Sequence, residues 1–336
     1  MNDLISVVIV NWNNKDYLSR CINSILNQTY NNTEVIFLDN QSTDGSYEYV
    51  QKLYPQTNII KYYSSKNLGY AGGANKGIKL SKGKYVIIMN PDVVLEPNFI
   101  EECYRFALQD ETIGAISGKL LKYDFNLDKK LNIIDSSGII VEKSRRAADR
   151  GQNEADTGQY DKIERIFGVC GAAAFYKRDA LEHIKIFEEY FDEDFFAYKE
   201  DVDLSWRLNL CGYKNMYYPL AVAYHGRGLG GSRGGVKKFI KNRENQSKFL
   251  RGISLRNHYL MLYKNETKHT FRKHMVYILT RNLLLLGYSL VYERFIFKYI
   301  KEAINLKAKM KTKKNEILQK QKISNEEMIS LFIDSK

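Results

Sequence analysis

The chain has 336 residues, 44% of them hydrophobic and 27% charged, which is the composition of a globular protein with a sizeable core. Its four cysteines lie far apart in the sequence, which excludes the short spacing of a zinc knuckle or a redox dithiol and favours a reducing, cytoplasmic location. The formal net charge of +12 could serve nucleic acid, anionic lipid or a phosphorylated substrate, and it does not choose among them.

Apolar, β-branched runs alternate with helical patterns over residues 4–118. The runs are ISVVIV, EVIFLD, NIIKYY and YVIIMN, and the clearest helical patterns lie at 17–26 and 99–108. In the first of these helices the apolar residues recur on one face: Leu18, Ile22, Ile25 and Leu26. The alternation predicts the α/β class, with a doubly wound, mostly parallel sheet flanked by helices.

The second part of the chain is less regular. No signal-peptide pattern precedes the first strand-like run, so we expect the protein to stay in the cytoplasm. Residues 119–165 are polar and predict short strands and loops, followed by a helix over 199–210 and two strands, one near Tyr217 and one over 221–224. A glycine-rich stretch at 225–235 then leads into basic helical sequence. This predicts an α/β domain at 1–235 and a basic helical C-terminal region at 236–336.

The C-terminal region holds an apolar stretch at 275–297. Four polar residues interrupt it, namely Arg281, Asn282, Glu293 and Arg294. Because a membrane span needs about 20 largely uncharged residues, we expect an interfacial or a core helix. The lysine-rich stretch 298–322 suits attachment to an anionic membrane surface, with a solvated helix as the alternative. Such helices could also join copies of the chain into a homo-oligomer.

Polar residues follow the strands of the predicted sheet, where loops converge on bound ligands. Asp39 ends the second strand and could accept a hydrogen bond from the N3–H of uracil or thymine. The segment KNLGYAGGANKG at 66–77 has four glycines that let a ligand approach the backbone, and it leads into a helix N-terminus that favours anions. Asp92 follows the fourth strand in an NPD turn, where a carboxylate could hold a hard cation or simply form a common turn. His225 ends the run AVAYH and is a structural residue or a ligand.

Three acids gather around the start of the helix predicted at 199–210, namely Glu200, Asp201 and Asp203. Acids this close raise one another's proton affinity, which suits a general base, whereas capping of the helix dipole is the alternative. Tyr198 and Trp206 could stack on a sugar or belong to the core. The stretch 226–235, which carries Arg233, could close over a ligand as a lid or serve as a connector.

In their order and spacing these segments resemble glycosyltransferase family 2, in particular its bacterial rhamnosyltransferase-like members with a GT-A fold. The resemblance covers 4–264 and is carried by SVVIVNWNN, LDNQSTDGS, KNLGYAGGANKG, the NPD variant of the DxD motif, RGQNEADTGQYD, VCGAAAFYKRDAL, FFAYKEDVDLSWRLNLCGY and LRNHYLMLYKN. It implies that Asp39 contacts the nucleobase, that Asp92 binds Mg²⁺ or Mn²⁺ through the donor diphosphate, and that His225 completes the metal site. Because Asn90 replaces the first acid of DxD, His225 gains importance.

The resemblance also implies roles for the remaining residues. Asp201 corresponds to the second acid of the family's ED pair and would deprotonate the acceptor hydroxyl, with Glu200 and Asp203 in support. Contacts to the acceptor, or a lid, would come from Tyr198, Trp206, Arg207 and Arg233. The donor nucleotide would be bound by Val10, Asn11, Asn13, Asp39, Asn67, Gly69, Gly73, Asn75 and Asn90.

These roles predict an inverting glycosyltransferase that moves one rhamnose or hexose from a dTDP- or UDP-sugar to a saccharide acceptor. We expect this acceptor to be lipid-linked and to belong to cell-surface polysaccharide synthesis. The QxxRW motif of processive synthases does not follow the acidic cluster, which favours one sugar per encounter. The alternative is a non-catalytic sugar-nucleotide-binding or assembly partner of the same fold. We expect no nucleic-acid partner, because an acidic crevice repels phosphates. The expected location is cytoplasmic or peripheral on the inner face of the cytoplasmic membrane.

Overall fold

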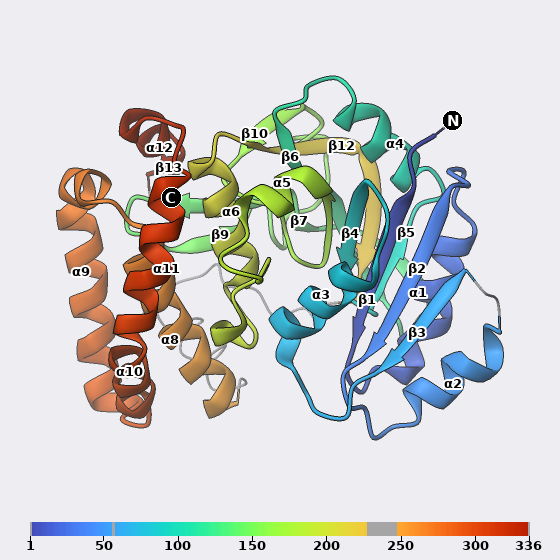
Figure 1. Ribbon diagram of the computed structural model, residues 1–336, viewed down its shortest axis with the longest axis horizontal. Helices are drawn as coiled ribbons and strands as arrows, with labels where there is room; N and C mark the ends of the chain where they lie inside the picture. The colour runs from blue at the N-terminus through green and yellow to red at the C-terminus, as the bar shows by residue number, and fades with distance from the viewer. Residues whose placement is uncertain (1, 56–57, 227–246, 335–336) are drawn as a thin grey trace.

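The computed structural model describes residues 2–55, 58–226 and 247–334, and its N-terminal part alternates strands with helices (Figure 1). The first strands are β1 (Ile5–Asn11), β2 (Thr33–Asp39), β3 (Ile59–Tyr63), β4 (Tyr85–Met89) and β5 (Val93–Leu95). The helices among them are α1 (Lys15–Leu26), α2 (Ser46–Leu53), α3 (Gly69–Leu80) and α4 (Phe99–Ala107). This order confirms the predicted alternation.

The middle of the chain adds further strands. These are β6 (Ile113–Asp124), β7 (Lys129–Ser136), β8 (Ile139–Glu142), β9 (Ala147–Asp149), β10 (Glu164–Ile166), β11 (Ala173–Lys177) and β12 (Lys214–His225), with α5 (Arg178–Ile184), the 3-10 helix η1 (Glu193–Phe195) and α6 (Glu200–Leu210) before β12. The predicted helix over 199–210 is confirmed by α6. The prediction of two strands near 217 and 221–224 is wrong, because a register shift between Tyr218 and Val222 lets β12 continue past Pro219 as one strand.

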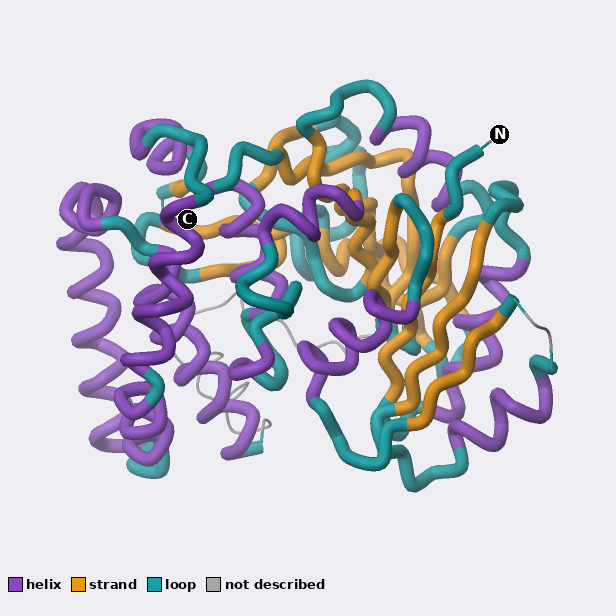
Figure 2. Tube along the Cα trace, in the orientation of Figure 1, coloured by secondary structure: helices purple, strands orange, loops and turns teal. Residues whose placement is uncertain are grey.

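The central sheet has ten strands in the order β10-β12-β6-β11-β4-β1-β2-β3, with β5 paired to β12 and β7 to β6. Strands β3, β2, β1 and β4 are parallel, whereas β11 runs antiparallel between β4 and β6. Figure 2 shows this twisted sheet with helices on both sides. The α/β class, the flanking helices and the C-terminal helical extension are confirmed. The parallel arrangement holds for the N-terminal strands and gives way to mixed pairing beyond β4.

Both faces of β1, of β4 and of most of β2 are buried, which explains their continuous apolar runs, whereas the edge strand β3 is partly exposed. Alternate residues of β1 serve the two faces: Val7 packs in a cluster with α1, and Val8 packs in a second cluster with α3. The predicted buried face of α1 is confirmed at Leu18, Ile22 and Ile25. Leu26, the last residue of the helix, is 37% exposed, so its predicted burial is wrong.

The C-terminal helices lie at the end of the molecule opposite β3 (Figure 1). They are α8 (Lys248–Asn265), α9 (Lys268–Tyr292), α10 (Ile296–Asn305), α11 (Lys307–Gln319) and α12 (Asn325–Ser330), and β13 (Phe332–Ile333) follows them. In the described part of the chain α9 alone is long and apolar enough to cross a membrane. Only 11% of its most apolar window is buried, so the alternative of a core helix is wrong, and the interfacial helix stays a prediction.

Candidate active site

Asp39 joins the carboxyl ends of β1 and β2. Its Oδ2 accepts a hydrogen bond from the side-chain amide of Asn11 at 2.9 Å, and its Oδ1 accepts one from the backbone N–H of Ser42 at 2.8 Å. Asp39 and Asn11 are both fully buried, and Oδ1 of Asn11 has no hydrogen-bond partner among the described residues. Asp39 therefore fixes the loops after these strands, and its contact with a nucleobase stays a prediction.

The loops beside Asp39 form one hydrogen-bonded rim. Asn13 has a left-handed φ of 55°, and its Oδ1 accepts a hydrogen bond from the N–H of Thr43 at 2.8 Å. The Oδ1 of Asn67 accepts hydrogen bonds from the amide of Asn40 at 3.0 Å and from the N–H of Gly69 at 2.8 Å. Three predicted residues, Asn13, Asn67 and Gly69, are thus joined to the loops after β1 and β2, and Gly69 is buried against Phe196.

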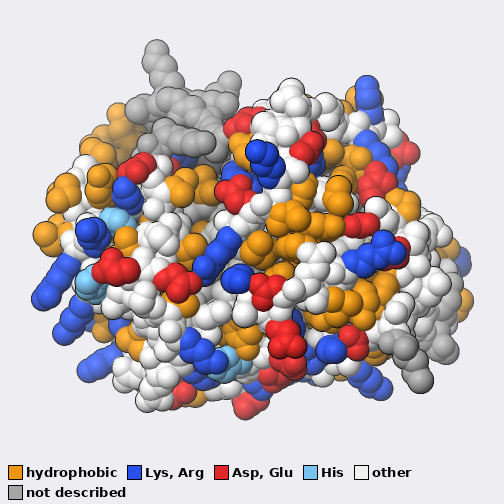
Figure 3. Space-filling model, turned by 90° about the horizontal axis from the view of Figure 1, so that it is seen from above, with side chains coloured by type: hydrophobic (Ala, Val, Ile, Leu, Met, Phe, Trp, Pro, Cys, Tyr) orange, Lys and Arg blue, Asp and Glu red, His pale blue; other side chains and the backbone are white. Residues whose placement is uncertain are grey.

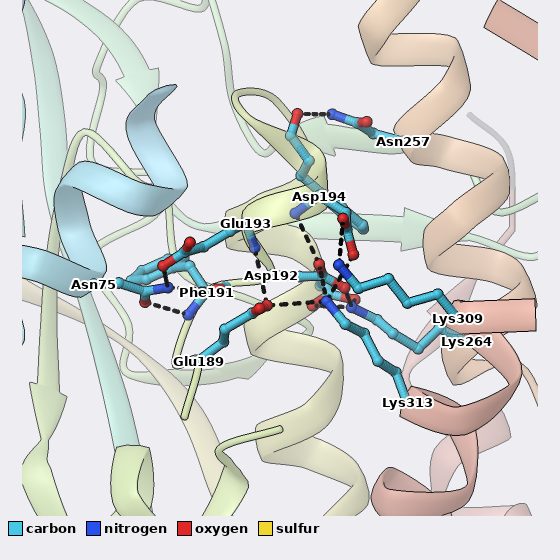
Figure 4. Close-up of polar contacts among 12 residues, drawn as sticks. Asn75, Glu189, Phe191, Asp192, Glu193, Asp194, Asn257, Lys264, Lys309 and Lys313 are labelled. Carbon is cyan, nitrogen blue, oxygen red and sulfur yellow. Dashed lines mark hydrogen bonds and ion pairs between the residues drawn. The ribbon is translucent and has the colours of Figure 1, made fainter. Parts of the chain in front are cut away.

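Other residues predicted to bind the nucleotide have packing roles. A Cβ on Gly73 would lie 2.7 Å from Cγ1 of Val10, so this glycine lets α3 approach β1. Asn75 is buried, and its side chain bonds both the N–H and the carbonyl of Phe191 at 2.8 Å (Figure 4). The prediction for Asn75 is wrong, because both polar atoms of its side chain are used within the fold, whereas a backbone contact of Gly73 stays a prediction. The side chain of Val10 is buried under α3, which leaves only its backbone for a ligand.

A carboxylate and an imidazole face each other at the ends of two strands. Asp92 follows β4, His225 ends β12, and Oδ1 of Asp92 lies 3.3 Å from Nε2 of His225. On the other side of the ring, Nδ1 lies 2.8 Å from Oδ2 of Asp135, which is fully buried near the end of β7. Burial opposes a charge on His225, but the carboxylates of Asp92 and Asp135 outweigh it and raise its pKa to about 9.

The donor set of this pair fits a divalent cation. A carboxylate oxygen and an imidazole nitrogen both ligate Mn²⁺, and a carboxylate on the second ring nitrogen orients such a histidine. Among the described residues no three His, Cys, Asp or Glu side chains are arranged to hold a metal ion by themselves. Asp92 and His225 would therefore need further ligands from a bound substrate. Sequence reasoning missed Asp135, which lies in the polar insertion where no regular pattern indicated strand ends.

Asp201, at the start of α6, lies beside the same strand ends. Its Oδ2 accepts a hydrogen bond from the backbone N–H of Gly171 at 3.3 Å. The next residue, Ala172, accepts a hydrogen bond from the N–H of Asn90 through its carbonyl at 2.9 Å. Two successive residues, Gly171 and Ala172, therefore connect the predicted base to the first residue of the NPD turn. No role could be assigned to Gly171 from the sequence, because its position beside Asp201 depends on the pairing of β4 with β11.

Of the two acids that begin α6, Glu200 is buried and Asp201 is half-buried. Burial, and next the carboxylate of Asp149, raises the pKa of Asp201. Burial and the carboxylate of Asp201 raise the pKa of Glu200 as well. Oε2 of Glu200 has no hydrogen-bond partner among the described residues. A carboxylate with a raised pKa in such a place is a stronger proton acceptor than one in water.

Three residues of α6 that were predicted to serve the site belong to the interior. The carboxylate of Asp203 is fully buried and is bound by Arg207 at 3.0 Å and by Lys264 at 2.9 Å. Trp206 is 1% exposed and packs against Phe167 and other core residues. The predictions of a supporting role for Asp203 and of acceptor contacts for Trp206 and Arg207 are therefore wrong. The carboxylate of Asp203, the guanidinium of Arg207 and the ring of Trp206 have partners within the fold, whereas Nε1 of Trp206 has no hydrogen-bond partner among the described residues.

The loop before α6 is held by the C-terminal helices. The side-chain Nδ2 of Asn257, on α8, lies 2.8 Å from the carbonyl oxygens of Phe195 and Ala197 and 2.9 Å from that of Tyr198. Tyr198 is 47% exposed and can still meet an acceptor. Arg233, the other residue predicted for a lid, lies outside the described residues. Asn257 was missed because nothing in the sequence links α8 to this loop.

A buried ionic network strengthens the same connection (Figure 4). The fully buried ammonium groups of Lys264, on α8, and Lys313, on α11, both contact the buried carboxylate of Asp192. Lys313 also lies 2.9 Å from a carboxylate oxygen of Asp194. Burial disfavours the charge on Asp192, but the two lysines outweigh that effect and hold its pKa well below its usual range. The C-terminal helices thus fix the segment that leads into Asp201.

Comparison with known proteins gives a match to the family model "Glycosyl transferase family 2" over residues 6–185. Glycosyltransferase GlyG of Streptococcus pneumoniae is 37% identical over 125 residues, which are 37% of this chain and 41% of GlyG. Poly-beta-1,6-N-acetyl-D-glucosamine synthase of Staphylococcus aureus is 24% identical over 226 residues, 66% of this chain and 49% of that protein. The chain thus spans about half or less of the length of these curated relatives.

Solved structures show the same fold. The mannosyltransferase PcManGT from Pyrobaculum calidifontis, in complex with GDP-Man and Mn²⁺, is similar over 95% of this chain and 86% of its own. Its TM-score is 0.54 and its sequence identity is 16%. The likeness extends over the C-terminal part of the chain, and at this identity it supports the fold alone.

Proposed function

Because the chain belongs to glycosyl transferase family 2, we propose that it moves one sugar from a nucleotide-diphosphate donor to an acceptor hydroxyl. The observation that carries this proposal is that residues 171–172 bond Asp201 through Gly171 and, through Ala172, bond Asn90 of the turn that carries Asp92, the partner of His225. Asp201 offers a proton acceptor, and the Asp92–His225 pair offers ligands for a metal bound to a diphosphate. Together they suit a displacement in which the leaving group and the nucleophile stand on opposite faces of the sugar.

Asp201 acts as the general base in this proposal. It takes the proton of the acceptor hydroxyl as that oxygen attacks the anomeric carbon, while the bond from this carbon to the diphosphate oxygen breaks. Attack from the face opposite the leaving group inverts the anomeric configuration. The raised pKa of Asp201 makes its carboxylate a better proton acceptor in the transition state.

Asp92 and His225 would hold Mg²⁺ or Mn²⁺ together with the donor diphosphate, and Asn90 would line the same place. When bound, the divalent ion neutralises negative charge that develops on the leaving diphosphate. Asp135 would accept the Nδ1–H of His225, so that Nε2, which faces Asp92, would be the nitrogen that ligates the ion after losing its proton. Asn11, Asn13, Asp39, Asn67 and Gly69 would bind the nucleotide, since they form the rim at the ends of β1 and β2.

The donor is a dTDP- or UDP-sugar and the transferred unit is a rhamnose or a hexose in this proposal. Uracil and thymine offer the same N3–H to an acceptor such as Asp39, so both bases fit. The acceptor is a lipid-linked saccharide in cell-surface polysaccharide synthesis, and the absence of a QxxRW motif favours transfer of one sugar per encounter. The name of the Staphylococcus aureus relative, a polysaccharide synthase, supports this setting.

The division of labour follows the chain: residues 1–235 bind the donor and carry the base, and residues 236–336 bind the acceptor and an anionic membrane on its cytoplasmic face. The exposed apolar surface of α9 supports membrane contact, as do the exposed lysines Lys298 and Lys301 beside it. Sedimentation with vesicles tests this part. Equal binding to vesicles with and without anionic lipid would contradict the electrostatic contribution.

The donor class is tested by thermal unfolding of the full chain with UDP, dTDP, GDP or NAD, each with and without Mn²⁺. A ligand that binds the folded state raises the unfolding temperature. We expect a Mn²⁺-dependent increase with UDP or dTDP and none with NAD. No increase with any nucleotide would contradict the proposed function. A nucleotide that binds without any measurable hydrolysis or transfer of its sugar would favour a non-catalytic partner instead.

A further inference from the structure

A cavity of about 700 Å³ lies among α8, α9, α10 and α11, away from the strand ends of the sheet. Most of its lining is apolar, including Leu260, Phe271, Ile278, Leu279, Leu283 and Ile300. Its charged lining residues gather toward the start of α9 and on α11, among them Lys268, Lys307 and Lys314. A cavity of this size and composition suits a hydrocarbon group more than a sugar or a nucleotide.

The cavity opens on the exposed apolar face of α9. Leu283 lines the cavity and is 68% exposed, and Leu279 and Leu286 are also lining residues with exposed side chains. Val276 and Leu284 continue the apolar surface outside the cavity. Figure 3 shows hydrophobic side chains on the side of the molecule where the C-terminal helices lie, with Lys and Arg side chains projecting beside them. An apolar chain could therefore enter from the surface that we propose to face a membrane.

Three successive residues of α8 connect the cavity to the proposed base. Asn257 binds the carbonyl groups of the loop that leads into Glu200 and Asp201. Tyr259 lines the cavity. Between them, the Nε2 of buried His258 lies 2.9 Å from Nη1 of Arg281, which comes from α9. Because successive helical residues point in different directions, one turn of α8 separates the acceptor side of the active site from the cavity.

Positive charge lies along this connection. Burial lowers the pKa of Lys199, the carboxylate of Asp201 opposes that effect, and the guanidinium of Arg281 adds to it. Arg281 contacts His258, and the neighbouring Asn257 binds the carbonyl of Tyr198, the residue before Lys199. An anionic group placed here would meet two cations close to the proposed base. The next residue of α9, Asn282, lines the cavity, and its buried Oδ1 has no hydrogen-bond partner among the described residues.

Resting on the proposed function, we infer that the cavity among α8–α11 holds the hydrocarbon chain of the acceptor, a saccharide joined to its lipid through a phosphate. The phosphate lies between Arg281 and Lys199, and the sugar hydroxyl reaches Asp201. The connection through Asn257, His258 and Tyr259 favours this occupant over a bulk phospholipid, which has no group for the active site. The two cations favour the lipid-linked acceptor over a second copy of the chain as well, because an apolar protein surface would not neutralise them.

The probe for this site is a fluorescent hexadecyl phosphate, whose binding to the full chain is followed by anisotropy. Ala303 lines the cavity, and Ala303→Trp places an indole ring in it, whereas Ala308→Trp places the same group on an exposed position of α11 outside the lining. We expect Ala303→Trp to weaken binding about tenfold or more and Ala308→Trp to leave it unchanged. Leu283→Glu, at an exposed position on the mouth, should weaken it as well if Ala303→Trp does not fold.

A second pair of variants tests the phosphate contact. Arg281→Gln should weaken binding of hexadecyl phosphate but not of an equally labelled hexadecanol, and Arg272→Gln, at an exposed position of the same helix, should change neither. Equal binding by the cavity variants and the parent chain would overturn the inference. So would full displacement of the probe by an equal concentration of soluble phosphatidylglycerol, or a dimer that Ala303→Trp dissociates. Binding of UDP and dTDP is measured in parallel. If a nucleotide binds and the probe does not, only the lipid site is refuted. If the probe binds and neither nucleotide does, the proposed donor is refuted.

Discussion

The Nε2 atom of His225 lies 3.3 Å from Oδ1 of Asp92, although one residue ends β12 and the other follows β4. The buried carboxylate of Asp135 occupies the opposite ring nitrogen at 2.8 Å. One carboxylate therefore orients the ring, and the other shares the side of the ring that is left for a ligand.

A graded loss of metal response should follow from this arrangement. His225→Asn removes a ligand, so the stabilisation by Mn²⁺ with UDP or dTDP should disappear. Asp135→Asn keeps the ligand but loosens its orientation, so the apparent affinity for Mn²⁺ should fall about 10- to 100-fold. The measurement is the unfolding temperature against Mn²⁺ concentration at a fixed nucleotide concentration. His269→Gln is the control, because His269 is exposed and pairs with Glu326 at the surface. Equal curves for all three variants would remove the metal site from His225.

Asp201→Asn should separate donor binding from transfer. The amide cannot take the proton of the acceptor, so the transfer rate should fall by about 10²–10⁴-fold, which is the usual contribution of a general base. The carboxylate also accepts a hydrogen bond from Gly171, which an amide oxygen can still accept. We therefore expect nearly unchanged stabilisation by the donor nucleotide. The measurement compares transfer in a single turnover with nucleotide binding, and near-normal transfer would show that another residue is the base.

Asp203→Asn should instead weaken the fold. The carboxylate of Asp203 neutralises Arg207 and Lys264 in the interior, and loss of one partner from a buried ion pair costs about 3–5 kcal/mol. Donor binding by the fraction that remains folded should not change. Unfolding by urea gives the free energy of unfolding, with Asp334→Asn as the control, since Asp334 is 74% exposed. A stable Asp203→Asn variant with impaired transfer would restore a functional role for this residue.

The sequence predicted the residues whose position depends on local structure. A strand that runs into a turn puts its last polar residue at the edge of the sheet, and Asp92 and His225 were predicted in this way. Asp201 was predicted from the cluster of acids at the start of α6 and from the family's ED pair. The direction in which each side chain points could not be predicted equally well. Asp203 lies only two residues after Asp201, but it points to Lys264, which comes from another helix. No spacing along the chain shows which of two neighbouring acids meets a buried lysine.

Residues joined by long-range packing were misassigned or missed for the same reason. Asn75 lies in a glycine-rich segment typical of a ligand site, but its amide is used by the backbone of Phe191. Asp135 had no signal, because only pairing of β7 with β6 brings it toward His225. The cavity among the C-terminal helices could not be predicted either. Apolar residues at helical spacing predict contact with an apolar partner, but the pattern does not distinguish another helix from a bound hydrocarbon chain.

The pH dependence of stability should reveal the raised pKa of Glu200 at the start of α6. Burial, and then the carboxylate of Asp201, raises the pKa of Glu200 from 4.5 to about 8. Below about pH 4.5 the group is protonated in both the folded and the unfolded chain and contributes no difference. Between pH 4.5 and 8 the unfolded chain releases a proton that the folded chain keeps, so the free energy of unfolding falls as the pH rises.

Glu200→Gln removes this titration, so the variant should gain stability relative to the parent chain as the pH rises, by roughly 2–5 kcal/mol at pH 8. Urea unfolding at several pH values between 5 and 9 measures the difference. Glu188→Gln is the control, because the side chain of Glu188 is 84% exposed. Asp201→Asn should give a smaller change of the same sign, because it removes the second cause of the shift. Parallel curves for Glu200→Gln and the parent chain would mean that Glu200 is ionised in the folded protein, which would also weaken the case for a raised pKa at Asp201.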